Sequence, residues 1–190
     1  MNARSTRGPL TLVLVGAVSM GLAQPAAPPR PAPELAQIKF FAGTWSCEGN
    51  VPASPMAPAR KTRTTVAVHA DLGGFWYSGT VREEKTAENP HPISGMFHET
   101  YDPANKQFMM LWVDNMGGWA TETSSGWDGD KIVYTGEGVM AGQKIPGRDT
   151  FVKKGPAELI HTAEMSMNGQ WMTMVEESCK KAPPPPAAKK

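Results

Sequence analysis

The stretch ELAQIKFFAGTWSCEGN, residues 34–50, decides the fold. A short amphipathic run is followed by Gly43-Thr44-Trp45, and a strand-like segment that carries Cys47 begins at once. Residues two apart on a strand share one face, so Trp45 and Cys47 should point the same way. We expect a helical turn here that leads directly into the first strand of a folded domain, with Trp45 pointing inward.

The rest of the chain predicts strands rather than helices, because no segment after Ala42 keeps a helical period for three turns. Short runs recur instead, and they end at turn residues such as Asn168-Gly169, which supply the positive φ that a tight hairpin needs. Short turns favour antiparallel neighbours, hence a meander. The expected strands cover residues 44–49, 62–70, 75–83, 93–101, 107–114, 119–126, 131–136, 148–153, 158–167 and 171–179.

Closure of this sheet is favoured over an open one, because an open meander would leave two unpaired edges. Closure makes the first and last strands neighbours, and Cys47 and Cys179 lie on those two strands. We expect a disulfide between them, although two separate buried thiols are the alternative. The predicted fold class is all-β, an up-and-down antiparallel barrel of about ten strands with a short N-terminal helix before the first strand.

The first residues predict export. Arg4 and Arg7 precede an apolar run from Leu10 to Leu22, and small residues follow, so residues 1–23 are expected to be a signal peptide. The alternative is an uncleaved anchor, but the run falls short of the roughly twenty residues that span a bilayer. We therefore predict a periplasmic or secreted protein with no transmembrane span, in a compartment where a disulfide persists.

Composition divides the remaining chain. Residues 24–33 and 182–190 are rich in proline, which removes backbone donors, so we expect a disordered tether and a disordered tail. The barrel domain should cover residues 34–181. The net charge of the whole sequence is +1 and no basic face stands out, so nucleic acid is not an expected partner. We make no prediction of oligomeric state.

Three segments carry a resemblance to a known family: GTW (residues 43–45), GMFHETYDPANKQFMMLWVDN (95–115) and GWDGDKIVYTGE (126–137). Together they resemble an uncharacterised bacterial family of exported calycin-like β-barrels, similar to lipocalins and fatty-acid-binding proteins. The resemblance implies an up-and-down barrel around a small apolar cavity, with Gly43 and Trp45 as structural residues and no established chemistry. In lipocalins a basic side chain near the final strand covers the signature tryptophan, and Lys180 or Lys181 could do so here by a cation–π contact.

The last hairpin admits two registers. A two-residue turn at Asn168-Gly169 places Met165 opposite Met172 and puts the hairpin's methionines on one face. A three-residue loop that begins at Met167 reverses the parity of the return strand and points Cys179 toward the face that a disulfide requires. A β-bulge on the return strand would reconcile the two. We favour the register that the disulfide requires.

The candidate cavity lining comes from two hairpins. In the hairpin around Asp102-Pro103, the face with Phe108, Met110 and Trp112 is favoured, and Met96 and His98 are expected across from these residues on the neighbouring strand. Periodicity alone does not exclude the opposite face, which carries Phe97, Met109, Leu111 and Val113. Flexible thioethers in the last hairpin suit a cavity that adapts to apolar ligands. The predicted ligand-binding residues are Met96, His98, Phe108, Met110, Trp112, Asp114, His161, Met165 and Met172.

The sequence favours binding over catalysis. It has no Gly-x-Ser-x-Gly elbow, and its paired glutamates are adjacent on strands and so face opposite sides. We predict no catalytic residue, metal ligand or cofactor, and a small apolar molecule as the partner. One alternative is an envelope structural or interaction module whose barrel is filled by side chains. A second is copper bound by methionines near His161, or a haem held by one histidine.

Overall fold

The computed structural model describes residues 28–53 and 58–183. The expected signal peptide, the first part of the expected tether and residues 184–190 of the expected tail lie outside the described residues. Neither of the two helical segments found in the described part, η1 (Pro33–Phe41) and η2 (Leu72–Gly74), is long and apolar enough to cross a membrane.

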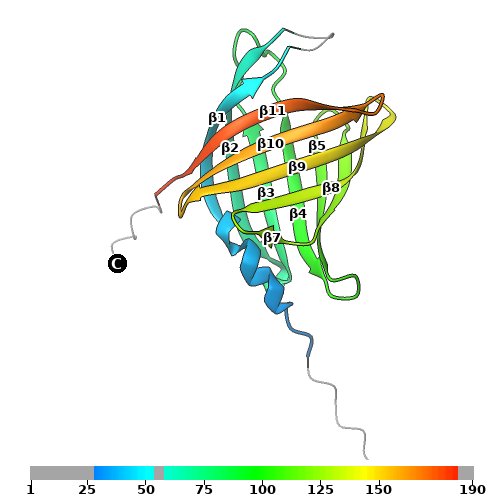
Figure 1. The fold of residues 1–190 in the computed structure, drawn as a ribbon. Helices are drawn as coiled ribbons and strands as arrows, with labels where there is room; N and C mark the ends of the chain where they lie inside the picture. Colours follow the sequence, from blue (N-terminus) through cyan, green and yellow to red (C-terminus); the bar gives the residue numbers. More distant parts are fainter. Residues whose placement is uncertain (1–27, 54–57, 184–190) are drawn as a thin grey trace, which may run out of the picture.

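The described residues form a closed antiparallel barrel (Figure 1), which confirms the predicted fold class. Each strand pairs with the next along the chain, except that β6 pairs with β8 instead of β7. The β1–β11 and β6–β8 pairings complete a ring of ten strands, and the two-residue β7 pairs only with β8. The strands are β1 (Gly43–Val51), β2 (Arg60–Asp71), β3 (Trp76–Glu83), β4 (Ser94–Asp102), β5 (Gln107–Asp114), β6 (Trp119–Ser124), β7 (Trp127–Asp128), β8 (Lys131–Met140), β9 (Gln143–Gly155), β10 (Glu158–Met167) and β11 (Gln170–Lys181).

The first and last strands of the ring are neighbours, as predicted. Cys47 on β1 lies directly opposite Cys179 on β11, and their sulfurs form a disulfide with an Sγ–Sγ distance of 2.03 Å. Both cysteines are buried among the core side chains. The disulfide therefore joins β1 and β11 on the inner side of the barrel, where alternation along β1 also places Trp45.

The last hairpin combines both predicted registers. Asn168 and Gly169 have positive φ and form a two-residue turn, so Met167 pairs with Gln170 and Met165 with Met172. The three-residue loop that we favoured is therefore wrong. A bulge then shifts the register between Ala163 and Glu164, and beyond it the inward parity of β11 matches the disulfide.

The 3₁₀ helix η1 covers one end of the barrel (Figure 1). Its buried residues are Leu35, Ile38 and Phe41, three apart, which fits the three residues per turn of a 3₁₀ helix. The start of η1 tolerates a proline, because the backbone N–H that proline lacks would have no partner within the helix at that position. The Trp45 Nε1–H donates to the carbonyl oxygen of Phe41 at 2.8 Å, so the signature tryptophan holds the helix to the first strand.

The predicted basic cover of the signature tryptophan is confirmed. The Lys181 ammonium lies 4.6 Å from the centroid of the Trp45 ring and donates to the carbonyl oxygen of Phe40 at 2.7 Å. Burial lowers the pKa of Lys181 from its ordinary value. One lysine on the final strand thus joins β11 to both the helix and the first strand.

The largest error in the strand prediction concerns β8 and β9, which are each longer than predicted. Their outer parts meet at a turn formed by Ala141 and Gly142, and Pro146 pairs with Glu137 inside the ladder. Glycine and proline are depleted in strands, so this glycine-rich segment gave a weak signal. The predicted strand over residues 119–126 is instead β6, which ends at Ser124 before the short β7.

Candidate ligand-binding cavity

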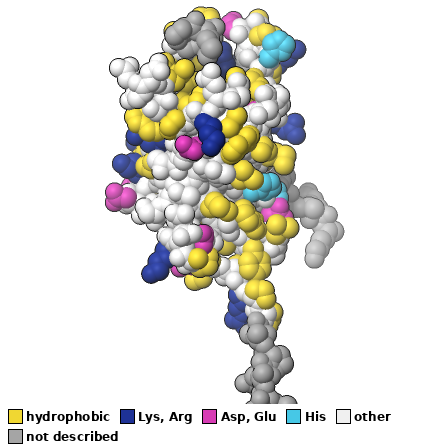
Figure 2. Space-filling view, turned by 90° about the vertical axis from the view of Figure 1, so that its right-hand side faces the viewer, with side chains coloured by type: hydrophobic (Ala, Val, Ile, Leu, Met, Phe, Trp, Pro, Cys, Tyr) yellow, Lys and Arg dark blue, Asp and Glu magenta, His cyan; other side chains and the backbone are white. Residues whose placement is uncertain are grey.

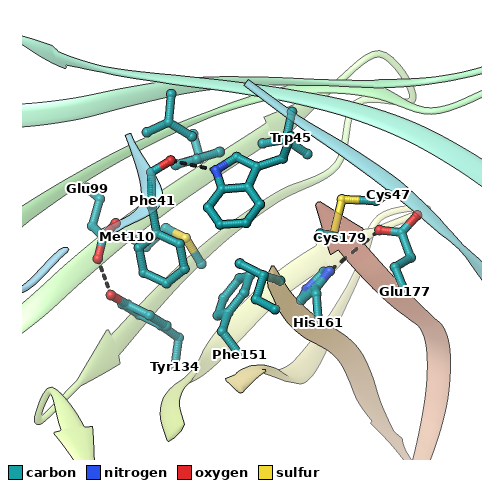
Figure 3. Close-up of a pocket in the computed structure, with 14 residues that line it drawn as sticks. Phe41, Trp45, Cys47, Glu99, Met110, Tyr134, Phe151, His161, Glu177 and Cys179 are labelled. Atoms are coloured by element: carbon teal, nitrogen blue, oxygen red, sulfur yellow. Dashed lines mark hydrogen bonds and ion pairs between the residues drawn. A yellow bond between two sulfur atoms is a disulfide. The ribbon is translucent and has the colours of Figure 1, made fainter. Parts of the chain in front are cut away.

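A small cavity of about 70 Å³ lies inside the barrel (Figure 3). Its wall is mostly aromatic and aliphatic, with a few polar groups on β4, β8, β10 and β11. The residues that line it are Phe41, Trp45, Cys47, Val66, Val68, Phe97, Glu99, Met110, Tyr134, Phe151, Leu159, His161, Glu177 and Cys179.

The aromatic part of the wall lies close to the helix-covered end. Phe41 of η1 packs edge-on against Phe151 of β9, with ring centroids 5.2 Å apart. On the opposite side, Phe97 crosses the barrel face of β3, where a side chain at Gly79 would overlap its ring. Gly79 is therefore required for Phe97 to lie flat against the neighbouring strand. Trp45, only 2% exposed, completes this aromatic wall.

Glu99 on β4 is the acidic group that faces this aromatic wall (Figure 3). It accepts a hydrogen bond from the Tyr134 hydroxyl, which is its only hydrogen-bond partner among the described residues. The side chain is almost completely buried, at 3% exposure. Burial raises the pKa of Glu99 to about 7, although the Tyr134 hydrogen bond opposes the rise. One carboxyl oxygen of Glu99 is thus left without a protein donor.

His161 on β10 lies between two carboxylates. Its Nε2 is 2.6 Å from Asp149 Oδ1, and its Nδ1 is 3.7 Å from Glu177 Oε2. The ring also stacks on Phe151. Burial disfavours the charged imidazole, but the bonds to Asp149 and Glu177 outweigh it and raise the pKa of His161 to about 9. The ring is therefore an imidazolium at neutral pH, and both of its N–H groups point at carboxylates.

Two further polar groups extend this network. Glu177 accepts a hydrogen bond of 2.6 Å from the Thr64 hydroxyl on β2, across the disulfide-bonded strands. Glu122 on β6 is 4% exposed, and one of its carboxyl oxygens has no hydrogen-bond partner among the described residues. Burial, and after it the neighbouring Asp149, raise the pKa of Glu122 to about 9. Glu122 is therefore neutral at pH 7.

Two of the nine predicted lining residues, Met110 and His161, line the cavity. Phe108 is fully buried and packs against Tyr101 in the core, outside the cavity wall. Met165 and Met172 lie opposite each other and half-buried near the last hairpin turn, also outside the wall. Where these residues lie does not test whether they bind a ligand.

Met96 and His98 lie on the other face of the sheet from Met110, so the predicted pairing of these residues needs correction. The turn between β4 and β5 pairs Asp102 with Gln107, which places Phe97 opposite Trp112 and Glu99 opposite Met110. This register differs by one residue from the predicted one, and such a slip exchanges the two faces. Met96 is accordingly 46% exposed.

Trp112 and Asp114 lie at the far end of β5 and do not line the cavity. Asp114 accepts hydrogen bonds from the backbone N–H groups of Met116 and Gly118, and from the Trp112 indole N–H at 3.2 Å. The side chain thus stabilises the β5–β6 turn, as short acidic side chains commonly do.

The geometry disfavours the metal and haem alternatives. Among the described residues, the one group of potential ligands is Cys47, Glu177 and Cys179, and both sulfurs are used in the disulfide. His161 lies across from Glu177 rather than from the methionine pair. A haem is far larger than the cavity, and a ring with both nitrogens paired to carboxylates has no lone pair to offer iron.

Most of the polar groups in the site were not predicted. Glu99, Tyr134 and Asp149 lie on strand positions that alternate with outward-facing residues, as ordinary inward positions do. Only the alternation of inward and outward positions along each strand could have indicated that these side chains face the interior. An inward acidic residue does not contribute to a hydrophobic pattern. For Glu177 a partial signal existed: two adjacent glutamates on a strand must face opposite sides, and here Glu176 is exposed while Glu177 is buried.

The outer wall of the barrel also carries apolar side chains. Met96, Val113 and Trp119 are successive cross-strand partners on β4, β5 and β6, and all three are exposed. Figure 2 shows one side of the molecule on which hydrophobic side chains gather with few charged groups between them. Contiguous apolar patches of this kind often mark contact surfaces.

These features define the class: a disulfide-closed, up-and-down antiparallel barrel with a small internal cavity. The chain belongs to the family described as protein of unknown function (DUF1579), whose model matches residues 30–181. It is also similar to the crystal structure of Rv2717c from M. tuberculosis, with a TM-score of 0.64 and 16% sequence identity over 81% of this chain and 100% of that chain. At this identity the likeness concerns the fold alone. No curated protein matches the chain.

Proposed function

We propose that this protein is an exported, calycin-like barrel that binds one small, mainly apolar molecule in its interior. The observation that carries the proposal is the cavity of about 70 Å³ lined by Phe41, Trp45, Phe97 and Phe151. Aromatic side chains fixed around a preformed space are typical of small-molecule sites.

The size of the cavity limits the ligand. A water molecule needs roughly 10–15 Å³ of such volume, so the cavity has room for about five to seven groups of that size. Burial of apolar ligand surface would contribute ~25 cal/mol per Å² before the cost of association is subtracted. The proposed ligand is therefore a short, compact molecule rather than a long-chain lipid.

The disulfide supports the export part of the proposal. Disulfides persist in oxidising compartments, and Cys47–Cys179 is a buried structural bond. The basic and apolar pattern of residues 1–23 supports the same conclusion. We therefore propose a periplasmic or secreted mature protein that lacks these residues.

Native mass spectrometry of protein isolated from its own cell envelope tests both parts. The expected polypeptide lacks residues 1–23 and two cysteine hydrogens, and it carries a small molecule that denaturation releases. Val68→Phe fills the cavity from β2 and should abolish the retained mass, whereas Val113→Phe, on the exposed outer face, should leave it unchanged. Equal retention by both variants would contradict an interior site, and a full-length mass with both cysteines in the reduced thiol form would contradict export.

The second candidate function, an interaction module of the cell envelope, is favoured by the exposed row of Met96, Val113 and Trp119. In that case Trp119→Ser should remove the phenotype of the protein while Val68→Phe preserves it. The reverse pattern is expected if the interior site carries the function.

A further inference from the structure

Acidic groups outnumber basic groups in the barrel interior. Four carboxyl groups face inward, on Glu99, Glu122, Asp149 and Glu177, and His161 is their cationic neighbour. Glu99, Met110 and Glu122 are successive cross-strand partners on β4, β5 and β6, so the acidic groups continue around the wall. Glu122 is neutral at pH 7, but Asp149 and Glu177 outnumber the single cation His161, and ionised Glu99 adds a further negative charge. A ligand in the cavity therefore meets a field that favours positive over negative charge.

The donors in the cavity wall are directed at acceptors of the protein itself, whereas the carboxyl of Glu99 has an oxygen to offer to a polar ligand. His161 bonds Asp149 through Nε2 at 2.6 Å, and its Nδ1 faces Glu177 at the ion-pair distance of 3.7 Å. The Tyr134 hydroxyl donates to Glu99. The Trp45 indole N–H donates to the Phe41 carbonyl. Among the described lining residues, Glu99 is the one whose carboxyl accepts a single hydrogen bond and so can accept another.

The nearby cations of the barrel are used elsewhere. Arg60 pairs with Glu83, and Lys181 donates to the Phe40 carbonyl above the Trp45 ring. Lys153 lies over the Trp127 ring, 3.4 Å from its centroid. None of these three residues lines the cavity. Among the described lining residues the cation is His161, which already faces Asp149 and Glu177, so a carboxylate or phosphate in the cavity would compete with two carboxylates for it.

We propose, resting on the proposed function, that the ligand of this cavity is a small alkylamine whose ammonium group pairs with Glu99 and whose hydrocarbon part packs against the aromatic wall. The ammonium would donate to the unpaired Glu99 oxygen beside Tyr134. Trp45 and Phe41 line the same cavity, and their ring faces attract cations. Such a pairing satisfies a buried acceptor that the protein leaves open.

Titration with three probes of similar size tests this inference: n-butylamine, n-butanol and butyrate. The Trp45 indole N–H resonance and its neighbours report binding by NMR at about pH 8, above the pKa of Glu99, which is raised to about 7. A charge-assisted hydrogen bond in a buried site should make n-butylamine bind at least about tenfold more tightly than n-butanol. Butyrate should not bind.

Two isosteric variants make the test specific. Glu99→Gln keeps the shape and the acceptor for Tyr134 but removes the charge, so the preference for n-butylamine over n-butanol should disappear. Glu122→Gln changes an equally buried carboxyl that does not line the cavity and is neutral at pH 7, so the preference should persist.

The outcomes separate this inference from the proposed function. If n-butanol or butyrate binds as tightly as n-butylamine, or if Glu99→Gln keeps the preference, the amine is the wrong ligand class although the cavity binds small molecules. If none of the three probes shifts the cavity resonances, the proposed interior site is contradicted, and this inference with it.

Discussion

At the scale of residues, three side chains in the barrel interior stay protonated at pH values at which the same groups would lose their protons in an unfolded chain. The pKa of Glu99 is raised to about 7, and those of Glu122 and His161 to about 9. A group with a raised folded pKa binds protons more tightly in the native state, so its contribution to stability is lost as the pH rises. All three groups act in the same direction.

We therefore expect the free energy of unfolding to fall as the pH rises. The loss due to Glu99 runs from its ordinary 4.5 to about 7, that of Glu122 from 4.5 to about 9, and that of His161 from 6.5 to about 9. Urea unfolding at intervals between about pH 5 and pH 9 measures this slope. A flat or rising curve over this range would show that these side chains titrate as they do in water.

Glu122→Gln isolates one of these contributions. The amide cannot ionise, so the variant should lose less stability than the native protein between about pH 5 and pH 9. Each unit of displaced pKa corresponds to about 1.4 kcal/mol, and we expect a relative gain above that figure at the alkaline end. Glu176→Gln, which changes an exposed glutamate on β11, is a control that should leave the slope unchanged.

At this scale, residue patterns predicted structural contacts better than they predicted the polar groups of the cavity. The Trp45 signature and its lysine cover followed from a resemblance, and the cysteine pair followed from closure of the sheet. The buried carboxyls did not follow, because a glutamate on an inward position has the same period as one on an outward position. Whether Glu99 faces the interior is decided by a single residue of register in the β4–β5 turn.

At the scale of elements, η1 is the segment that most depends on its tertiary contacts. A nine-residue 3₁₀ helix is long for its type and intrinsically weak. Its buried stripe therefore holds it on the barrel end. The sequence indicated a helical turn here, and the three-residue spacing of Leu35, Ile38 and Phe41 could have indicated the 3₁₀ type.

Ile38→Ala should destabilise the protein by roughly 2–5 kcal/mol, because Ile38 is fully buried at 0% exposure. The removed methyl and methylene groups leave a space beneath η1 that the rigid barrel end cannot close. Urea unfolding measures the loss. Lys39→Ala, on the exposed face of the same helix, should change stability by less than about 0.5 kcal/mol. Equal effects of the two substitutions would mean that η1 contributes little to the folded state.

The last hairpin shows why element boundaries were easier to predict than register. Both β10 and β11 were located, but their hydrophobic alternation fitted two registers. The turn dipeptide Asn168-Gly169 sets the register next to the turn, and the disulfide sets the register at the far end of β11. The bulge beside Ala163 lets the hairpin adopt both registers. A bulge changes parity inside a strand, and no feature of the local composition marks its position.

At the scale of the whole molecule, closure of the barrel depends on one seam between β1 and β11. Six residue pairs join these strands, and the disulfide lies in the middle of the seam between residues 132 apart in sequence. Every other pairing in the ring joins strands that are next or nearly next to each other along the chain. The seam is therefore the contact with the largest loop-closure cost.

Reduction of the disulfide should accordingly cost much stability without changing the fold. A cross-link that closes a loop of this length restricts the unfolded chain by about 4–5 kcal/mol in the chain-entropy description. Urea unfolding with and without dithiothreitol measures the difference, and a Cys47→Ala, Cys179→Ala double variant should be insensitive to the reductant. Since Trp45 still pairs with Lys181 in the same seam, far-ultraviolet circular dichroism should remain that of a barrel. A loss below about 1 kcal/mol would mean that the unfolded chain already holds its ends together, and strand pairing rather than the disulfide would then close the ring.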